Sequence, residues 1–169
     1  SVEYYLGHSM ELQPPKHLVR LSAVLMTTDS SRLFRAILSD NASKAIAFYS
    51  NEQLVATVRH FALAGLINLD FVRGVETLLP RNKKKFFSVS GILDDPKNCF
   101  ETLVAFSMVS RSLEDFQLEP DFRNKLMKSA KKAAVKWTDE QRFLAHTAFK
   151  ELTKLSDSDT REQLMFLEE

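Results

Sequence analysis

Apolar residues recur at helical spacing along most of the chain, and the pattern is clearest between Ser50 and Pro80. Ser50 and Gln53 stand three positions apart ahead of an apolar run, which predicts a capping box that opens a helix. The positions that share one face of this helix are Leu54, Val58, Phe61, Ala62 and Gly65. We therefore expect a helix from about residue 51 to Gly65, since glycine tolerates the left-handed turn of a helix C-terminus.

A second amphipathic helix follows in the same stretch. Asn68 is placed to cap its start and Pro80 to end it. Its apolar stripe is made of Phe71, Val72, Val75, Leu78 and Leu79. Two consecutive helices with facing apolar stripes predict a helix-turn-helix pair that needs neighbours on either side to cover it.

The same periodicity predicts helices in the rest of the chain. Asp95 before Pro96 is typical of a helix start, and Thr138 with Gln141 forms a second capping box. The expected helices cover residues 16–26, 33–38, a short one capped by Asp40 and carrying Ile46 and Tyr49, 96–113, 121–137, and one after Thr138 whose aligned residues are Leu144, Ala148, Leu152 and Leu155.

The fold class that follows is all-α, in a single domain over residues 1–169. Leucines that begin successive helix pairs recur at intervals of roughly 35 to 50 residues, which favours an α-solenoid of the armadillo or HEAT type. They are Leu18, Leu54, Leu103 and Leu144. The helical period is lost over residues 81–95, where we expect an insertion loop. A compact helical bundle remains the alternative architecture.

Composition supports packed helices and limits the function classes. The chain has 13 Phe but only 4 Gly and 5 Pro, fewer turn residues than β-rich domains need. The single Cys99 excludes an intrachain disulfide or a thiolate zinc cluster and suits a reducing, intracellular compartment. The sequence contains no run of about 18 apolar residues, so it predicts no membrane span. Because the chain opens at Ser1 without a signal-peptide pattern, we expect an excised fragment or a processed product.

Net charge is +1, so any nucleic-acid binding must come from a local patch. The helix expected at 121–137 offers one, because no acidic residue interrupts it after Asp121. The basic residues opposite its apolar arc are Lys125, Lys128, Lys131, Lys132 and Lys136, with Arg123 at the boundary. Such a face can follow a phosphate backbone without reading sequence. The alternative is a solvated helix face whose last lysines complement the helix dipole.

A second basic segment precedes two aromatic residues, Phe86 and Phe87. Its basic residues are Arg81, Lys83, Lys84 and Lys85. In an exposed loop the rings could stack on bases. Alternatively, Phe86 and Phe87 insert into the core and the lysines keep the loop in solvent.

Catalytic chemistry is not indicated. The four histidines are scattered without an i, i+4 pair, and no phosphate-binding glycine loop or nucleophile elbow occurs. His60 is expected on the polar surface of its helix, and Cys99 as a small buried residue. We therefore expect a protein that is not an enzyme, with no cofactor, no metal and no small-molecule substrate.

The string Phe61-Ala-Leu-Ala-Gly-Leu66, followed by Asp70 and a second amphipathic helix, resembles the helix-turn-helix repeats of organellar RNA-binding proteins of the octotricopeptide and FAST-kinase-like families. The resemblance implies a helical-repeat module of an RNA-processing or RNA-stabilising ribonucleoprotein assembly, in a mitochondrion or plastid. RNA and protein subunits of that assembly would be its partners. The alternative function is a protein–protein interaction scaffold without nucleic-acid contact, for which a near-neutral charge is a natural background.

Overall fold

The computed structural model of the chain describes residues 14–25, 32–80 and 92–154. Regular structure in these ranges is helical throughout, without a strand, which confirms the all-α prediction. The α-helices are α2 (Pro15–Val24), α3 (Arg32–Lys44), α4 (Asn51–Leu63), α5 (Leu69–Leu78), α6 (Pro96–Ser112), α7 (Pro120–Ala133) and α8 (Asp139–Thr153). Short 3-10 helices are η2 (Ile46–Phe48), η3 (Ile92–Asp94) and η4 (Ala134–Lys136). None of the described helices combines the length and the apolar character that a membrane crossing needs.

The chain divides into two compact units, residues 1–75 and residues 76–169, with the boundary inside α5. Each unit is described by itself. The expectation of one domain over residues 1–169 stays a prediction.

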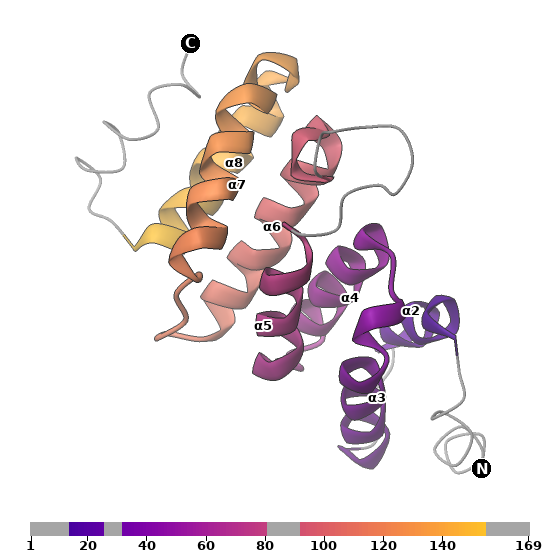
Figure 1. Cartoon of the computed structure of the whole chain (residues 1–169). Coiled ribbons are helices and arrows are strands. Elements are labelled where there is room, and N and C mark those ends of the chain that lie inside the picture. Colours follow the sequence, from indigo (N-terminus) through magenta and orange to yellow (C-terminus); the bar gives the residue numbers. More distant parts are fainter. Residues whose placement is uncertain (1–13, 26–31, 81–91, 155–169) are drawn as a thin grey trace. The chain divides into compact units, whose positions relative to one another are not determined.

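In the first unit, α2 packs against both α3 and α4 (Figure 1). Its core is formed by side chains that are almost fully buried, and Phe71 at the start of α5 contacts the ring of Phe61 at a centroid distance of 5.8 Å. The core residues include Leu18, Phe34, Leu38, Leu54, Val58, Phe61 and Phe71. The apolar stripe predicted for α4 and the start of the stripe predicted for α5 therefore share the core of the first unit.

The helix boundaries of the first unit follow from local hydrogen bonds. The Ser50 hydroxyl accepts from the Gln53 amide at 3.2 Å and the Gln53 side chain accepts from the Ser50 amide at 2.8 Å, which confirms the capping box. Gly65 has φ +66°, the left-handed turn expected after α4. Asn68 caps α5 by accepting from the Phe71 amide at 3.0 Å.

In the second unit, α6 is the central helix and packs against α7, α8 and η3. The Trp137 indole donates to the Pro96 carbonyl at 2.9 Å and its ring contacts Phe100, so the end of η4 is held against the start of α6. Asp95 caps α6 by accepting from the Asn98 amide at 2.9 Å, as predicted. The buried core residues include Leu103, Phe106, Phe122, Leu126 and Phe149.

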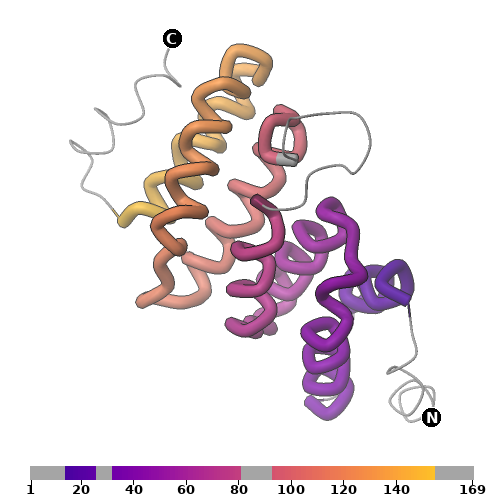
Figure 2. The backbone as a smooth tube through the Cα atoms, viewed as in Figure 1, coloured from indigo at the N-terminus to yellow at the C-terminus, as the bar shows by residue number. Residues whose placement is uncertain are grey.

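The two units repeat one succession of elements (Figure 2). In each, a first helix packs against a second and a third, the second ends in a 3-10 turn, and a capping box opens the third. Equivalent residues stand 88 positions apart: Ser22 and Ser110, Phe34 and Phe122, Leu38 and Leu126, Ala42 and Ala130, Tyr49 and Trp137, Gln53 and Gln141, Phe61 and Phe149. All of these except the two glutamines are buried. The repeat therefore preserves the residues that make the core.

The prediction that Asp40 caps a separate helix is wrong. Asp40 lies inside α3, which continues to Lys44, and these two side chains form an ion pair at 2.8 Å. An i, i+4 pair of this kind supports a continuing helix rather than a new start. The segment after α3 is only the short η2.

The apolar face expected for the helix after Thr138 is confirmed at Ala148 and Leu152 and is wrong at Leu144. The capping box is present, but Leu144 is 45% exposed. The buried residues of α8 are Ala145, Ala148, Phe149 and Leu152, and Leu155 lies outside the described residues. Ala145 and Phe149 are the buried positions that the leucine spacing did not indicate. The predicted insertion at 81–95 lies outside the described residues up to residue 91, and its end is η3 followed by the Asp95 cap.

Candidate nucleic-acid interface

The basic helix predicted for residues 121–137 is α7 followed by η4. Pro120 occupies its first turn, and the backbone amide of Glu119 donates to the buried carboxylate of Glu76 at 3.0 Å. The α-helical hydrogen bonds end at Ala133, and Trp137 closes a tighter 3-10 turn on Ala134. The start and the end of the helix are therefore both fixed by contacts within the second unit.

Its two faces divide as the sequence predicted. The apolar side is buried by Phe122, Leu126, Ala130 and Ala133. The six basic residues are all exposed: Arg123, Lys125, Lys128, Lys131, Lys132 and Lys136. The helix thus buries one face on the unit's core and presents the other to solvent.

The basic residues do not form one uniform surface. At about 100° per residue, Lys125, Lys128 and Lys132 fall within an arc of roughly 60°. On the same count Lys131 lies farther round the helix and Arg123 nearly opposite Lys125, while Lys136 belongs to η4. Three of the six predicted basic residues therefore lie on the same side of the helix.

These three lysines line a pocket of about 250 Å³. Its walls come from three separate stretches of the second unit, namely the end of α5, η3 and α7. The lining residues are Leu79, Pro80, Leu93, Asp94, Lys125, Lys128, Ser129 and Lys132. The pocket joins an apolar wall to a basic one, with Asp94 as the only carboxylate among the described lining residues.

Ser129 is the polar residue that α7 places closest to the core within this lining. Ser129 is 8% exposed and lines the pocket at its inner edge. The described residues with a buried side-chain polar atom that lacks a hydrogen-bond partner are Tyr49 and Thr57, so Ser129 is not among them. Ser129 can nevertheless offer a hydroxyl to a group that enters the pocket.

The second basic segment cannot be placed. Arg81, Lys83, Lys84 and Lys85, with Phe86 and Phe87, lie outside the described residues. In sequence the segment begins directly after Pro80, which is a pocket residue.

The expectation that His60 is a surface residue is wrong. It is half-buried between α4 and α2, where its Nδ1 lies 2.9 Å from the Ser22 hydroxyl. Burial and the nearby charge of Arg59 lower the pKa of His60. The single hydroxyl hydrogen of Ser22 is directed at the Val19 carbonyl at 2.7 Å, so His60 donates from Nδ1 and the serine accepts. Ser22 is fully buried, so the pair is structural and not a nucleophile with its base.

Cys99 is buried, as the sequence predicted. Burial raises the pKa of its thiol to about 12, and the charges of Asp94 and Asp95 act in the same direction. The reactive thiolate is therefore suppressed at neutral pH. Within the described ranges, no three His, Cys, Asp or Glu side chains are grouped so that they could hold a metal ion.

Comparison of the chain with protein-family models, with curated proteins and with solved structures finds no match. The candidate interface therefore rests on its own geometry.

Proposed function

We propose that this chain is a non-enzymatic helical-repeat module that binds single-stranded RNA through the exposed basic face of α7. The observation that carries the proposal is that Lys125, Lys128 and Lys132 line one pocket together with Ser129. Exposed lysines neutralise phosphate charge, and each contact releases counterions. Phosphate contacts of this type give affinity and position without base specificity.

The repeated order of helices supports a short α-solenoid as the architecture behind this surface. In an α-solenoid each repeat packs on the next, and here α2 with α3 and α4 has the same succession and core residues as α6 with α7 and α8. The resemblance of the Phe61–Leu66 string to organellar RNA-binding repeats adds a mitochondrial or plastid ribonucleoprotein assembly to the proposal. The compact helical bundle is the competing architecture.

The test is fluorescence anisotropy of a labelled single-stranded RNA, titrated at two salt concentrations, with an acidic peptide as the control ligand. We expect binding that falls steeply with salt and no response to the peptide. Reversing Lys125, Lys128 and Lys132 to Glu should weaken binding to every RNA sequence and reduce the slope of log affinity against log salt by about 2, at about 0.7 per lost phosphate contact.

The matched control reverses three other exposed lysines: Lys16, Lys97 and Lys154. It produces the same change in net charge at lysines that do not belong to α7. If both variants lose affinity equally, net charge alone accounts for binding and the assignment to α7 fails.

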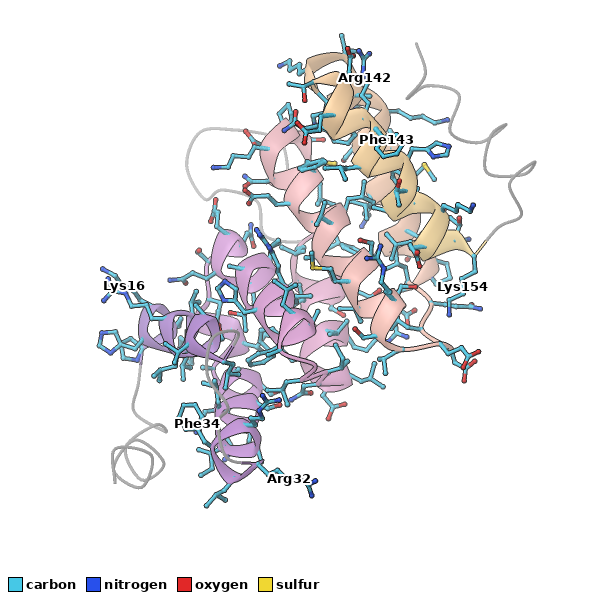
Figure 3. All side chains as sticks on the ribbon, turned by 180° about the vertical axis from the view of Figure 1, so that it is seen from behind. Lys16, Arg32, Phe34, Arg142, Phe143 and Lys154 are labelled. Atoms are coloured by element: carbon cyan, nitrogen blue, oxygen red, sulfur yellow. The ribbon has the colours of Figure 1, made fainter. Side chains whose placement is uncertain are left out.

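A protein partner is the second candidate, because the second unit also exposes large apolar side chains. Val135 in η4 is 87% exposed and Phe143 is 71% exposed, next to Arg142 near the start of α8 (Figure 3). Exposed apolar groups of this size are typical of protein-binding surfaces when they cluster. Absence of RNA binding at low salt would favour this scaffold function.

A further inference from the structure

We infer that the α7 pocket is a subsite for the terminal phosphate monoester of a single-stranded RNA, with Lys125, Lys128 and Lys132 around the phosphate and Ser129 donating to one of its oxygens. The inference rests on the proposed function and adds the chemical group that the same site recognises.

Charge is the first argument. Three lysines and one aspartate give the lining a formal charge of +2. An internal RNA phosphate carries a single negative charge, whereas a phosphate monoester carries about −1.5 to −2 at neutral pH and has three strong acceptor oxygens. The pocket therefore matches a terminal phosphate better than a phosphate within the strand.

Donor number is the second argument. An ammonium group offers three donors, and the Ser129 hydroxyl in the pocket lining adds another. An exposed lysine face is sufficient to follow a backbone, and it does not require a hydroxyl in a pocket lining. Ser129 lines the pocket beside the three lysines, so a phosphate that enters the pocket meets a hydroxyl donor as well as ammonium groups.

Size and wall chemistry are the third argument. A volume of about 250 Å³ lies just below the range of about 300–1,000 Å³ that encloses a drug-sized ligand. It exceeds what a phosphate group needs, and the remaining wall is apolar, from Leu79, Pro80 and Leu93. This combination fits a phosphate together with the sugar of the first nucleotide, while the following phosphates run along the exposed lysines of α7.

The experiment compares one RNA sequence with a 5′-phosphate, with a 3′-phosphate and with hydroxyl groups at both ends. We expect one phosphorylated form to bind about tenfold or more tightly than the hydroxyl form, the effect of one or two hydrogen bonds to a charged group. A nucleoside monophosphate should compete for this preference, and inorganic phosphate should compete more weakly because it lacks the sugar.

Two variants locate the effect. Ser129→Ala should reduce the end preference while general RNA binding remains, and Lys128→Ala should reduce both. Ser107→Ala is the matched control, because Ser107 is a buried serine of the same unit that bonds within its own helix. Fluorescence of Trp137, the only tryptophan, verifies that each variant is folded.

The outcomes separate the two proposals. Equal binding of all three RNAs, or a preference that survives in Ser129→Ala and Lys128→Ala, would overturn the subsite and leave the RNA-binding function in place. Binding of the nucleoside monophosphate without any end preference in RNA would overturn the assignment to an RNA terminus. Failure of every RNA to bind at low salt would overturn both.

Discussion

Helices α3 and α7 occupy equivalent places in the two units, yet only one of them carries a basic face. Phe34 and Leu38 in α3 are buried in the same register as Phe122 and Leu126 in α7. The surface positions differ: Ile37, Asp40 and Lys44 in α3 stand where α7 has Lys125, Lys128 and Lys132.

The comparison separates the buried residues that folding requires from the surface charges that it does not require. In α3 the Asp40 carboxylate pairs with Lys44 at 2.8 Å, so this surface is locally neutralised. In α7 none of the three lysines pairs with a carboxylate among the described residues. Since the same helix packs without a lysine face in the first unit, the lysines of the second are not required for packing. Their accumulation is what the proposed binding of an anionic ligand would require.

The largest expected effect comes from breaking the shared core. Leu38→Ala and Leu126→Ala each remove a fully buried side chain, and each should lower the free energy of unfolding by about 2–5 kcal/mol. Trp137 fluorescence reports the second unit, so denaturant unfolding followed by fluorescence should detect Leu126→Ala strongly. Far-UV circular dichroism should detect both variants.

This pair also tests the separation of the units. If Leu38→Ala shifts the fluorescence transition as much as the dichroism transition, the units unfold together, and their comparison as two separate folding units is wrong.

Next in size is the transfer of the lysine arrangement from α7 to α3. Ile37→Lys with Asp40→Lys, beside the native Lys44, copies the spacing of the α7 lysines. RNA affinity at low salt should rise by up to about tenfold and depend more steeply on salt, because each added phosphate contact contributes about 0.7 to the slope. Anisotropy titrations of the variant and the native chain measure both quantities.

The same variant distinguishes a face from a pocket. We expect the transferred lysines to add no preference for a phosphorylated RNA end, because they do not line a pocket together with Ser129, Leu79 and Leu93. An increased end preference in this variant would show that lysine spacing alone is sufficient.

The two capping boxes should give smaller and equal effects. Ser50→Ala and Thr138→Ala each remove one side-chain acceptor, at 3.2 Å from the Gln53 or the Gln141 amide. Each should lower the free energy of unfolding by about 1 kcal/mol. Thermal unfolding of both variants checks this, and a marked inequality would mean that the two boxes are not equivalent in energy.

The smallest expected effect is a difference in acid sensitivity. The buried Ser22 contacts His60, whereas the equivalent Ser110 donates to the backbone carbonyl of Glu151 at 2.9 Å. The folded-state pKa of His60 is lowered from 6.5, so the unfolded chain binds the proton more readily. Stability of the first unit should therefore be complete above about pH 6.5 and decrease as the pH falls below it.

The measurement is dichroism-monitored unfolding between pH 7.5 and pH 5.5, with His60→Gln as the control. The variant should lose the part of the pH dependence that the native chain shows in this range. An identical pH profile for both proteins would assign the effect to other groups.

Helix starts could be predicted from the sequence because they depend on residues three apart. The caps at Ser50, Asn68, Asp95 and Thr138 are all confirmed, and each is closed by a bond from its own helix. The buried face of α8 was predicted only in part: Ala148 and Leu152 are buried as expected, whereas Ala145 and Phe149 are buried through tertiary packing. The leucine spacing pointed to Leu144, which is largely exposed.

For the candidate site, the charge pattern predicted the exposed lysines but not the pocket beside them. The remaining walls come from Leu79 and Leu93, which are distant from α7 in sequence. One sequence feature could have indicated Ser129 as a site residue. It is a polar residue beside Ala130, on the apolar side of an amphipathic helix.

The most direct test of the central claim is a two-dimensional amide NMR titration of the isotope-labelled chain with single-stranded RNA at low salt. We predict shifts concentrated between Arg123 and Lys136 and at Leu79 and Leu93, with residues 35–48 of the equivalent helix unaffected. Shifts of equal size in both helices, or shifts confined to Val135 and Phe143, would contradict an RNA-binding surface centred on α7.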